Sequence, residues 1–209
     1  MRITVLGSTG PTGKSIVRQA LLAEYEVTAV TRTAYLFDHP GLEVKQGDVA
    51  SPAFLQDALN GSDAVLSALG SHDMKSSTTL YSSSASAAIA AMRASAVRRF
   101  ICISASPVMP ETLKPALNRY VLDPVLHQFF GGGYDDMRRM ETILAKSDLD
   151  WTVFRPPYLR NARARGHYRV AIDSGLPFAF SITREDLAAA MLAAITDSKT
   201  FHHAVMIAN

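Results

Sequence analysis

The chain of 209 residues has little cysteine and little net charge, and each shortage excludes a class of protein. The single cysteine, Cys102, can form neither an internal disulfide nor a cysteine-based metal site, which points to a reducing compartment. Lys and Arg total 21 against 19 Asp and Glu, and a net charge of +2 is too small for a general polyanion-binding surface. We therefore expect a cytoplasmic protein that does not bind nucleic acid.

Long apolar runs are also missing. The amino terminus carries only a short strand-like segment before Gly7, which is shorter than the apolar stretch of a secretory signal. The most apolar later stretch, residues 84–94, is rich in alanine and falls well short of the roughly 20 residues that span a bilayer. The sequence predicts neither a signal peptide nor a membrane span.

What the chain does have is an apolar content of 48%, enough for one domain with its own core. Short apolar runs alternate with segments of helical spacing. This alternation predicts an α/β protein with a doubly wound parallel sheet of the Rossmann type, in a single domain over residues 1–209. Strands are expected at residues 3–6, 27–30, 42–45, 64–67, 99–104, 151–154 and around Val205, and helices at residues 14–23, 52–59, 78–95, 134–146 and 184–195.

Two insertions, residues 106–133 and 156–181, interrupt the alternation, and each directly follows a predicted strand. Because ligands of open parallel sheets bind beyond the carboxyl ends of the strands, we expect both insertions to form the substrate side of the molecule. Within the first insertion, residues 131–133 are all glycine and are interpreted as a flexible loop. Asp135 and Asp136 then favour the start of a helix.

The segment Gly7-Ser-Thr-Gly10-Pro-Thr-Gly13-Lys-Ser lies between the first predicted strand and helix. As a P-loop for ATP or GTP it is defective, because Ser8 stands where a glycine is needed. As the Gly-x-x-Gly-x-x-Gly of dinucleotide sites it is complete. Gly7 would allow the turn, Gly10 would let the backbone approach a diphosphate, and Gly13 would let helix and strand pack closely. Its position favours the dinucleotide, and a purely structural turn is the other alternative.

Residues after the next strands add detail. Arg32 stands where NAD-binding proteins usually carry an acid, which favours the 2′-phosphate of NADP; a solvated arginine is the alternative. Asp48 follows the third strand and is a candidate either to accept from an adenine amino group or to cap its own loop. Gly70 ends the fourth strand, where backbone passing close to a ribose would explain the glycine.

These motifs, with Ala68-Leu-Gly70, Ser104 and Trp151-Thr-Val-Phe-Arg-Pro-Pro-Tyr158, resemble the atypical short-chain dehydrogenase/reductases over essentially the whole chain. The most similar branch is the NAD(P)H-binding flavin reductase and biliverdin-IXβ reductase-like group, with NmrA-like proteins as neighbours. The resemblance implies NADP(H) as cofactor and places Ser104 beside the reacting ring. The residues that it implies for cofactor binding are Gly7, Thr9, Gly10, Pro11, Thr12, Gly13, Arg32, Asp48, Val49, Leu69, Gly70, Ser104, Pro156 and Pro157.

Ordinary short-chain dehydrogenases carry a Tyr-x-x-x-Lys pair, in which the lysine lowers the tyrosine pKa for proton exchange with a carbonyl. This chain has Tyr134-x-x-x-Arg138, and an arginine cannot act as a titratable amine. Tyr134 and Ser104 are the candidate catalytic residues, but usual carbonyl reduction is not expected. The flavin reductase branch lacks the pair and still moves hydride, because its acceptor can take a proton from solvent.

Tyr158, Arg160, Arg163 and Arg165 follow the Pro-Pro turn. Three arginines so close together predict a loop, with Gly166 as a hinge, that attracts an anionic planar acceptor; a solvated loop is the alternative. The predicted function is an NADPH-dependent reductase of a flavin, quinone or pigment-like acceptor, with no metal. A non-catalytic NADP-sensing protein of the NmrA-like type and a carbonyl or sugar-nucleotide reductase using Tyr134 are the alternatives. The sequence leaves the oligomeric state open.

Overall fold

The computed structural model describes residues 1–33, 38–113, 120 and 123–209. The strands are β1 (Arg2–Leu6), β2 (Glu26–Thr31), β3 (Leu42–Gln46), β4 (Ala64–Ser67), β5 (Arg99–Ile103), β6 (Asp150–Arg155), β7 (Tyr158–Arg160), β8 (Arg169–Ile172), β9 (Ser181–Thr183) and β10 (His203–Ala208). The α-helices are α1 (Pro11–Leu22), α2 (Pro52–Ala58), α3 (Leu80–Ala94), α4 (Asp123–Ala145) and α5 (Arg184–Ala193).

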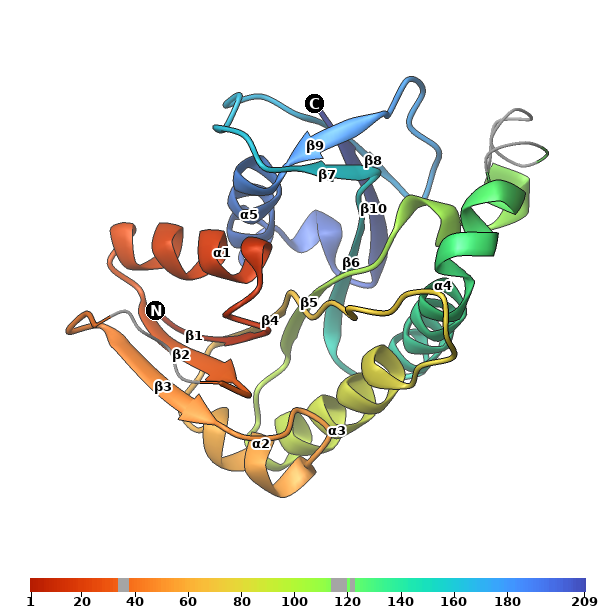
Figure 1. Cartoon of the computed structure of the whole chain (residues 1–209). Coiled ribbons are helices and arrows are strands. Elements are labelled where there is room, and N and C mark those ends of the chain that lie inside the picture. Colours follow the sequence, from red (N-terminus) through yellow and green to blue (C-terminus); the bar gives the residue numbers. More distant parts are fainter. Residues whose placement is uncertain (34–37, 114–119, 121–122) are drawn as a thin grey trace.

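Eight of the strands form one sheet in the order β3-β2-β1-β4-β5-β6-β10-β8 (Figure 1). Neighbouring strands of this sheet pair in parallel, except that β8 runs antiparallel to β10 at the edge. Strand order reverses between the neighbouring strands β1 and β4, so the crevice typical of doubly wound folds lies at the carboxyl ends of these two strands. The predicted α/β fold with a doubly wound sheet is confirmed.

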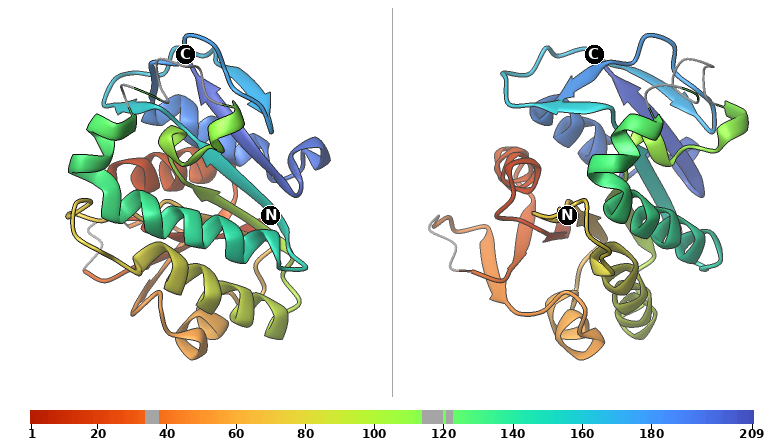
Figure 2. Two further views of the ribbon diagram at one scale, coloured as in Figure 1. Left: turned by 90° about the vertical axis from the view of Figure 1, so that its right-hand side faces the viewer. Right: turned by 45° about the vertical axis from the view of Figure 1, so that its right-hand side comes forward.

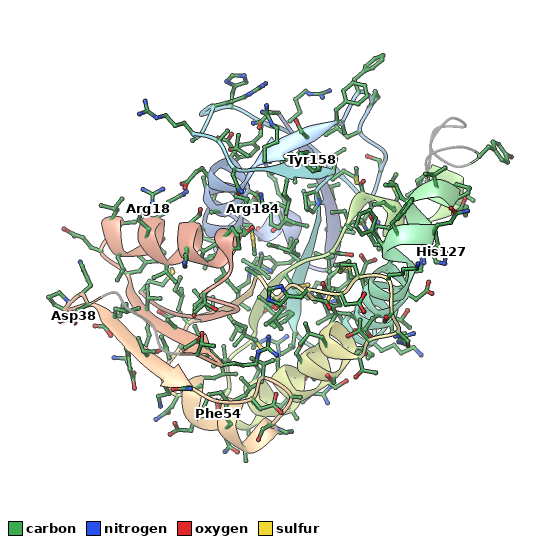
Figure 3. The ribbon with its side chains drawn as sticks, in the orientation of Figure 1. Arg18, Asp38, Phe54, His127, Tyr158 and Arg184 are labelled. Atoms are coloured by element: carbon green, nitrogen blue, oxygen red, sulfur yellow. The ribbon has the colours of Figure 1, made fainter. Side chains whose placement is uncertain are left out.

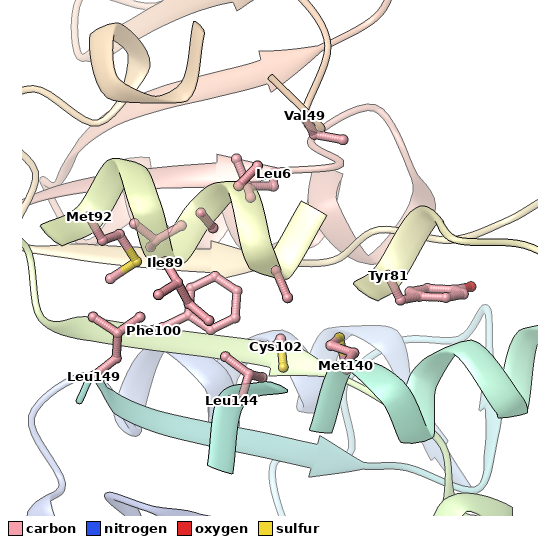
Figure 4. Packing of buried hydrophobic residues seen from close by; sticks show 14 of the residues in the cluster. Leu6, Val49, Tyr81, Ile89, Met92, Phe100, Cys102, Met140, Leu144 and Leu149 are labelled. Atoms are coloured by element: carbon pink, nitrogen blue, oxygen red, sulfur yellow. The ribbon is translucent and has the colours of Figure 1, made fainter. Parts of the chain in front are cut away.

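Helices cover both faces of the sheet: α1 and α5 lie on one face, and α2, α3 and α4 on the other (Figure 2). Strand β5 shows the consequence, because its side chains alternate between two apolar clusters. Phe100 and Cys102 join the cluster under α3 and α4 (Figure 4), whereas Ile101 joins the cluster under α1 and α5. Burial raises the pKa of the Cys102 thiol well above its usual value. Cys102 is therefore a packed core residue, as the sequence indicates.

The glycine run at residues 131–133 lies inside α4, so its interpretation as a flexible loop is wrong, and the helix begins at Asp123 rather than at Tyr134. The reason is tertiary packing. A Cβ on Gly132 would lie 2.0 Å from the carbonyl oxygen of Ser76, and one on Gly133 would lie 2.3 Å from Met74 Cε. The glycines let residues 74–76 rest directly on the helix, and this contact offsets the low helix propensity of glycine.

Asp136 also differs from its predicted role at a helix start. Its carboxylate is fully buried in α4 and accepts hydrogen bonds from the backbone N–H groups of Tyr81 and Ser82, at 2.7 and 3.4 Å. It therefore caps the amino terminus of α3, a helix that no side chain of its own N-cap residue caps. The Asp136 carboxylate of α4 thus stabilises the amino-terminal end of α3.

The second insertion, residues 156–181, is built from short strands. β7 and β9 pair in parallel as a separate two-stranded sheet, and β8 extends the edge of the main sheet. β7 begins directly after the carboxyl end of β6, so the insertion lies on the expected side of the sheet. In the described ranges, no helix is both long and apolar enough to cross a membrane.

Candidate cofactor and substrate site

The glycine turn after β1 has the close contacts that the dinucleotide interpretation requires. Gly7 has a φ of +75°, and a Cβ there would lie 2.8 Å from the Ala68 carbonyl oxygen at the end of β4. A Cβ on Gly13 would lie 2.1 Å from the carbonyl oxygen of Gly7. Helix α1 begins at Pro11 rather than at residue 14, so Gly13 lies in its first turn. Gly7 thus allows the chain to turn after β1, and Gly13 allows α1 to pack closely on the end of β1.

Gly10 and Gly70 are different, because the fold does not need glycine at either position. Gly10 has a φ of −69°, and the nearest atom to a Cβ there is 3.4 Å away. A Cβ on Gly70 would meet nothing within 4 Å. Both residues lie at the carboxyl edge, after β1 and β4 respectively. Close passage of a ligand over the backbone would explain both glycines.

The amino terminus of α1 points its positive end at the same edge. Gly10 is the N-cap, no side chain caps the helix, and its first turn contains no acid. Such a terminus attracts a diphosphate. Ser8, which stands where a P-loop needs glycine, is buried and donates to the Val30 carbonyl oxygen at 2.9 Å. Ser8 therefore ties the turn to β2. Thr9 and Thr12 lie in the same turn, with Thr12 buried and Thr9 partly exposed.

The end of β2 presents Arg32 to solvent. Its backbone is held because its carbonyl oxygen accepts from Gln46 Nε2 at 3.0 Å, and within the described part of the chain no acid pairs with its guanidinium. Asp48 Oδ1 accepts from the backbone N–H of Ala50 at 2.9 Å, so this carboxylate does cap its own loop. Its other oxygen takes no part in that bond. The neighbouring Val49 is buried in the core, at 3% exposure.

Ser104 follows β5 and lies against the end of β6. Its backbone N–H donates to the Phe154 carbonyl oxygen at 2.7 Å, and the N–H of Ser106 donates to that of Pro156 at 2.9 Å. The Ser104 side chain is 2% exposed, and its Oγ has no hydrogen-bond partner among the described residues. A serine that merely capped the following turn would use this oxygen. The structure thus brings Ser104 close to the Pro156-Pro157 turn without giving its hydroxyl a structural task.

Tyr134 lies in the core rather than in an open site. It is 9% exposed, and its ring centroid is 5.9 Å from that of Phe130. Arg138 donates to Asp135 Oδ1 at 2.8 Å and to the Pro107 carbonyl oxygen at 3.2 Å. The guanidinium thus ties α4 to the segment after β5. This arrangement differs from a Tyr-x-x-x-Lys pair, in which the cation serves the tyrosine.

The predicted substrate residues divide into two groups. Tyr158, labelled in Figure 3, and Arg160 lie in β7, whereas Arg163 and Arg165 lie in the exposed loop that follows. The loop is anchored, because the N–H groups of Arg165 and Gly166 donate to the carboxylate of Asp186 at 2.9 and 3.0 Å. Gly166 has a φ of +74°. The carboxylate at the start of α5 therefore ties down the residue expected to be a hinge.

Sequence reasoning missed the residues that position these loops. Tyr81 is buried in α3, and its hydroxyl accepts from the N–H of Ser71 at 3.0 Å and donates to Met74 Sδ at 3.2 Å, which holds the segment after Gly70. Asp186 holds the arginine loop in the same way. No local pattern marks either residue, because both act on segments far away in the chain. Among the described residues, no three side chains of His, Cys, Asp or Glu gather as metal ligands would.

The chain is similar to several proteins of known structure. It matches the oxidoreductase ylbE of Lactococcus lactis with 21% identity and a TM-score of 0.82, covering 100% of this chain and 91% of that one. It matches a short-chain dehydrogenase/reductase of Veillonella parvula, in complex with NADP, with 19% identity and a TM-score of 0.81, covering 100% and 94%. At these identities the likeness shows the fold alone.

Curated relatives include the photosystem II assembly factors Ycf39 of Trieres chinensis and Guillardia theta. They are 27% and 26% identical over 160 residues, which cover 74% of this chain but only 45% and 46% of theirs. This chain therefore spans less than half the length of those relatives. The profile of the NAD(P)H-binding family matches residues 7–198, from the glycine turn to beyond α5. With the glycine turn, the uncapped helix and the sheet edge in place, the chain belongs to the NAD(P)H-binding family.

Proposed function

We propose that this protein is an NADPH-dependent reductase, of the flavin reductase-like kind, that transfers hydride to a planar conjugated acceptor such as a flavin, quinone or pigment. The observation that carries the proposal is the Ser104 hydroxyl, which is buried, unpaired and close to Pro156 at the carboxyl end of a central strand. Leaving a buried hydroxyl without a partner costs about 1–3 kcal/mol. A site that needs this hydroxyl for a ligand explains why it is kept.

The residues present fit an NADP(H) molecule along the carboxyl edge. The amino terminus of α1 and Gly10 would hold the diphosphate, and Arg32 the 2′-phosphate that distinguishes NADP from NAD. The free oxygen of Asp48 would accept from the adenine amino group, and Leu69 and Gly70 would line a ribose. Thr9, Pro11 and Thr12 would surround the diphosphate, and Val49, Pro156 and Pro157 would bound the two ring systems. When bound, the cofactor supplies the hydride.

The protein's own part in the reaction is positioning. Ser104 would donate its hydroxyl hydrogen at the reacting end of the site, where the fold gives it no other acceptor. No side chain of the site would have to supply a proton, because solvent can protonate the reduced acceptor. Tyr134 is not needed for this step, since its ring is buried and Arg138 binds Asp135 rather than serving the tyrosine.

Two other functions are the alternatives. The Ycf39 relatives are assembly factors, which favours a protein that binds NADP(H) and presents a surface to a partner without turnover. A structural neighbour from Bacteroides thetaiotaomicron is a putative epimerase with 23% identity and a TM-score of 0.82, covering 99% of this chain and 96% of that one. The second alternative, a carbonyl or sugar-nucleotide reductase, would use Tyr134 as its acid.

The test is anaerobic oxidation of NADPH by FMN, riboflavin and quinones, followed at the nicotinamide absorbance band. The wild type is compared with two variants that each lack one hydroxyl group, Ser104→Ala and Tyr134→Phe. The Ser104 variant should lose about 10²-fold in kcat with unchanged NADPH affinity, as when a preorganised donor is removed. The Tyr134 variant should change kcat by less than about threefold, because Tyr134 is not the proton donor in this mechanism. Removal of a true general acid would instead lower kcat by about 10²–10⁴-fold.

Two results would overturn the proposal. A hundredfold loss in the Tyr134 variant would identify the carbonyl reductase. Tight NADPH binding without turnover of any acceptor would identify the sensor or assembly protein.

A further inference from the structure

Arg160 is partly buried, and two of its donor atoms lack acceptors among the described residues. Its Nε and Nη2 are both solvent-inaccessible, and neither has a hydrogen-bond partner among the described residues. In the described part of the chain, the only other buried side-chain polar atom without a partner is Ser104 Oγ. Ser104 follows β5 and Arg160 lies in β7, so both come after the carboxyl ends of strands of the main sheet, β5 and β6 respectively.

The two buried arginines among the described residues, Arg99 and Arg155, both have acceptors. Arg99 donates to five oxygens, among them Thr152 Oγ1 at 2.8 Å and the Ala194 carbonyl oxygen at 2.5 Å. Arg155 forms a largely buried ion pair with Glu141. The fold therefore supplies acceptors for buried guanidinium groups wherever they have a structural role. Arg160 is the exception, and its unpaired donors are a cost to the folded protein.

Strand β7 places an aromatic ring on the same side as this guanidinium. Leu159 packs into the apolar cluster under α1 and α5, so Tyr158 and Arg160, the alternate residues of the strand, share the opposite face. Tyr158 is 73% exposed. The strand itself is fixed, because it pairs with β9 and the Leu159 carbonyl oxygen accepts from Arg184 Nη1 at 2.9 Å. Figure 3 shows Tyr158 on β7 and Arg184 at the start of α5.

The segment of the chain that contains β7 is positively charged. Residues 158–181 contain four arginines and a single acid, Asp173, although the whole chain has a net charge of only +2. Asp173 pairs with His203, and its Oδ1 accepts from the backbone of Ala204. Asp186 uses its oxygens on backbone N–H groups and on polar side chains. No described acid is thus positioned to neutralise Arg160.

We propose that Arg160 and Tyr158 form a subsite for an aromatic anion, in which the ring of the ligand stacks on Tyr158 and its phosphate or carboxylate binds Arg160. This inference rests on the proposed function, because it makes that ring the hydride acceptor. Rotation of the Arg160 side chain toward the ligand sacrifices no hydrogen bond, since its buried donors have none. The planar fork of a guanidinium then pairs with the anion through two donors.

The test compares binding of FMN and riboflavin, which share the ring and differ in the phosphate, to protein saturated with NADP⁺. Flavin fluorescence reports binding without any need for turnover. In the wild type, FMN should bind at least about tenfold more tightly, the effect of one charge-assisted contact. Arg160→Met should abolish this preference, Arg160→Lys should keep part of it, and the matched control Arg93→Met, at an exposed arginine that pairs with Asp148 at the end of α3, should keep all of it.

A thermal melt separates binding from a structural role. Because Nε and Nη2 of Arg160 have no hydrogen bond to a described residue, Arg160→Met should leave Tm unchanged or raise it, whereas a structural arginine would lower Tm on replacement. Equal binding of the two flavins, binding of neither, or an FMN preference that survives in Arg160→Met would overturn the subsite. If inorganic phosphate competes for the site as strongly as FMN itself binds, the ring of the flavin contributes nothing, and the stacking on Tyr158 is overturned.

The outcomes also separate this inference from the proposed function. An FMN preference that depends on Arg160, without oxidation of NADPH, would contradict the reductase and keep the anion subsite. Equal turnover of both flavins, unaffected in Arg160→Met, would contradict the subsite and keep the reductase.

Discussion

Gly13 sits so close to Gly7 that a Cβ on Gly13 would lie 2.1 Å from the carbonyl oxygen of Gly7. The first turn of α1 therefore rests directly on the end of β1. Gly10 lies between them in the chain, and there the corresponding distance to the same oxygen is 3.4 Å. One glycine motif thus contains residues with two different tasks, folding and access for a ligand.

This difference predicts opposite effects of two alanine substitutions. Gly13→Ala should reduce the free energy of unfolding by at least about 1–3 kcal/mol, the usual cost of overpacking a close contact. Gly10→Ala should change it little and should weaken NADPH binding, because a methyl group would stand where the diphosphate approaches. Thermal unfolding and fluorescence titration with NADPH measure the two quantities. NADPH affinity unchanged by Gly10→Ala would refute the placement of the diphosphate.

Cofactor choice depends on Arg32 in this account. An exposed arginine at the end of β2, without an acidic partner in the described chain, should favour NADPH over NADH by roughly ten- to hundredfold, since a charge-assisted phosphate contact is worth about 1.5–3 kcal/mol. Arg32→Ala should remove most of this preference and leave NADH affinity nearly unchanged. Arg18→Ala, which breaks an ion pair with Glu185 on the outside of α1, is the control. Equal wild-type affinities for the two cofactors would show that Arg32 is a solvated arginine.

Neighbouring aspartates in α4 should differ sharply in their effect on stability. Asp136 is buried and caps α3, so Asp136→Ala should cost about 0.5–2 kcal/mol for the cap, or more because Ser82 also loses an acceptor. Asp135 is half exposed and pairs with Arg138, so Asp135→Ala should cost less than about 1 kcal/mol. Urea denaturation of both variants measures this contrast. Similar losses in both would mean that Asp136 does not stabilise α3.

Asp186 predicts a pH dependence of stability. Burial alone would raise its pKa, but hydrogen bonds from the Arg165 and Gly166 backbone, the Thr183 hydroxyl and the Asn209 amide more than offset burial and lower the pKa below its ordinary value. A carboxylate with a lower pKa in the folded state stabilises the fold above its unfolded pKa of about 3.9, and this contribution is lost as pH falls through the folded pKa.

Replacement of Asp186 should therefore reduce stability at neutral pH and flatten the acid limb of the stability curve. Asp186→Asn keeps the shape of the side chain but cannot ionise. Unfolding free energies from urea titrations between neutral pH and the lowest pH at which the protein stays folded provide the measurement. An acid slope equal to that of the wild type would show that the Asp186 carboxylate does not contribute.

The elements that the sequence predicted well are those with short-range causes. Alternating apolar runs and the turn at Gly7 predict β1, β2, β4, β5 and β6 and the crevice that they form. Predictions failed where a distant segment decides. The glycines of α4 form a helix because residues 74–76 pack on them, and β8 joins the sheet because β10 offers it an edge. The unpaired state of Arg160 depends on the absence of acceptors in space, which no sequence pattern reveals.

The central claim is that NADPH bound at the carboxyl edge passes hydride to a planar acceptor. Its most direct test is a single turnover under anaerobic conditions, in which protein with bound NADPH is mixed with FMN and the nicotinamide and flavin absorbances are followed together. Both bands should decay at one rate, and faster than without protein. The rate should fall when NADPH is deuterated at the transferred position, and it should also fall in the Ser104→Ala variant. NADPH that stays bound and unoxidised while FMN, riboflavin or a quinone is present would contradict it.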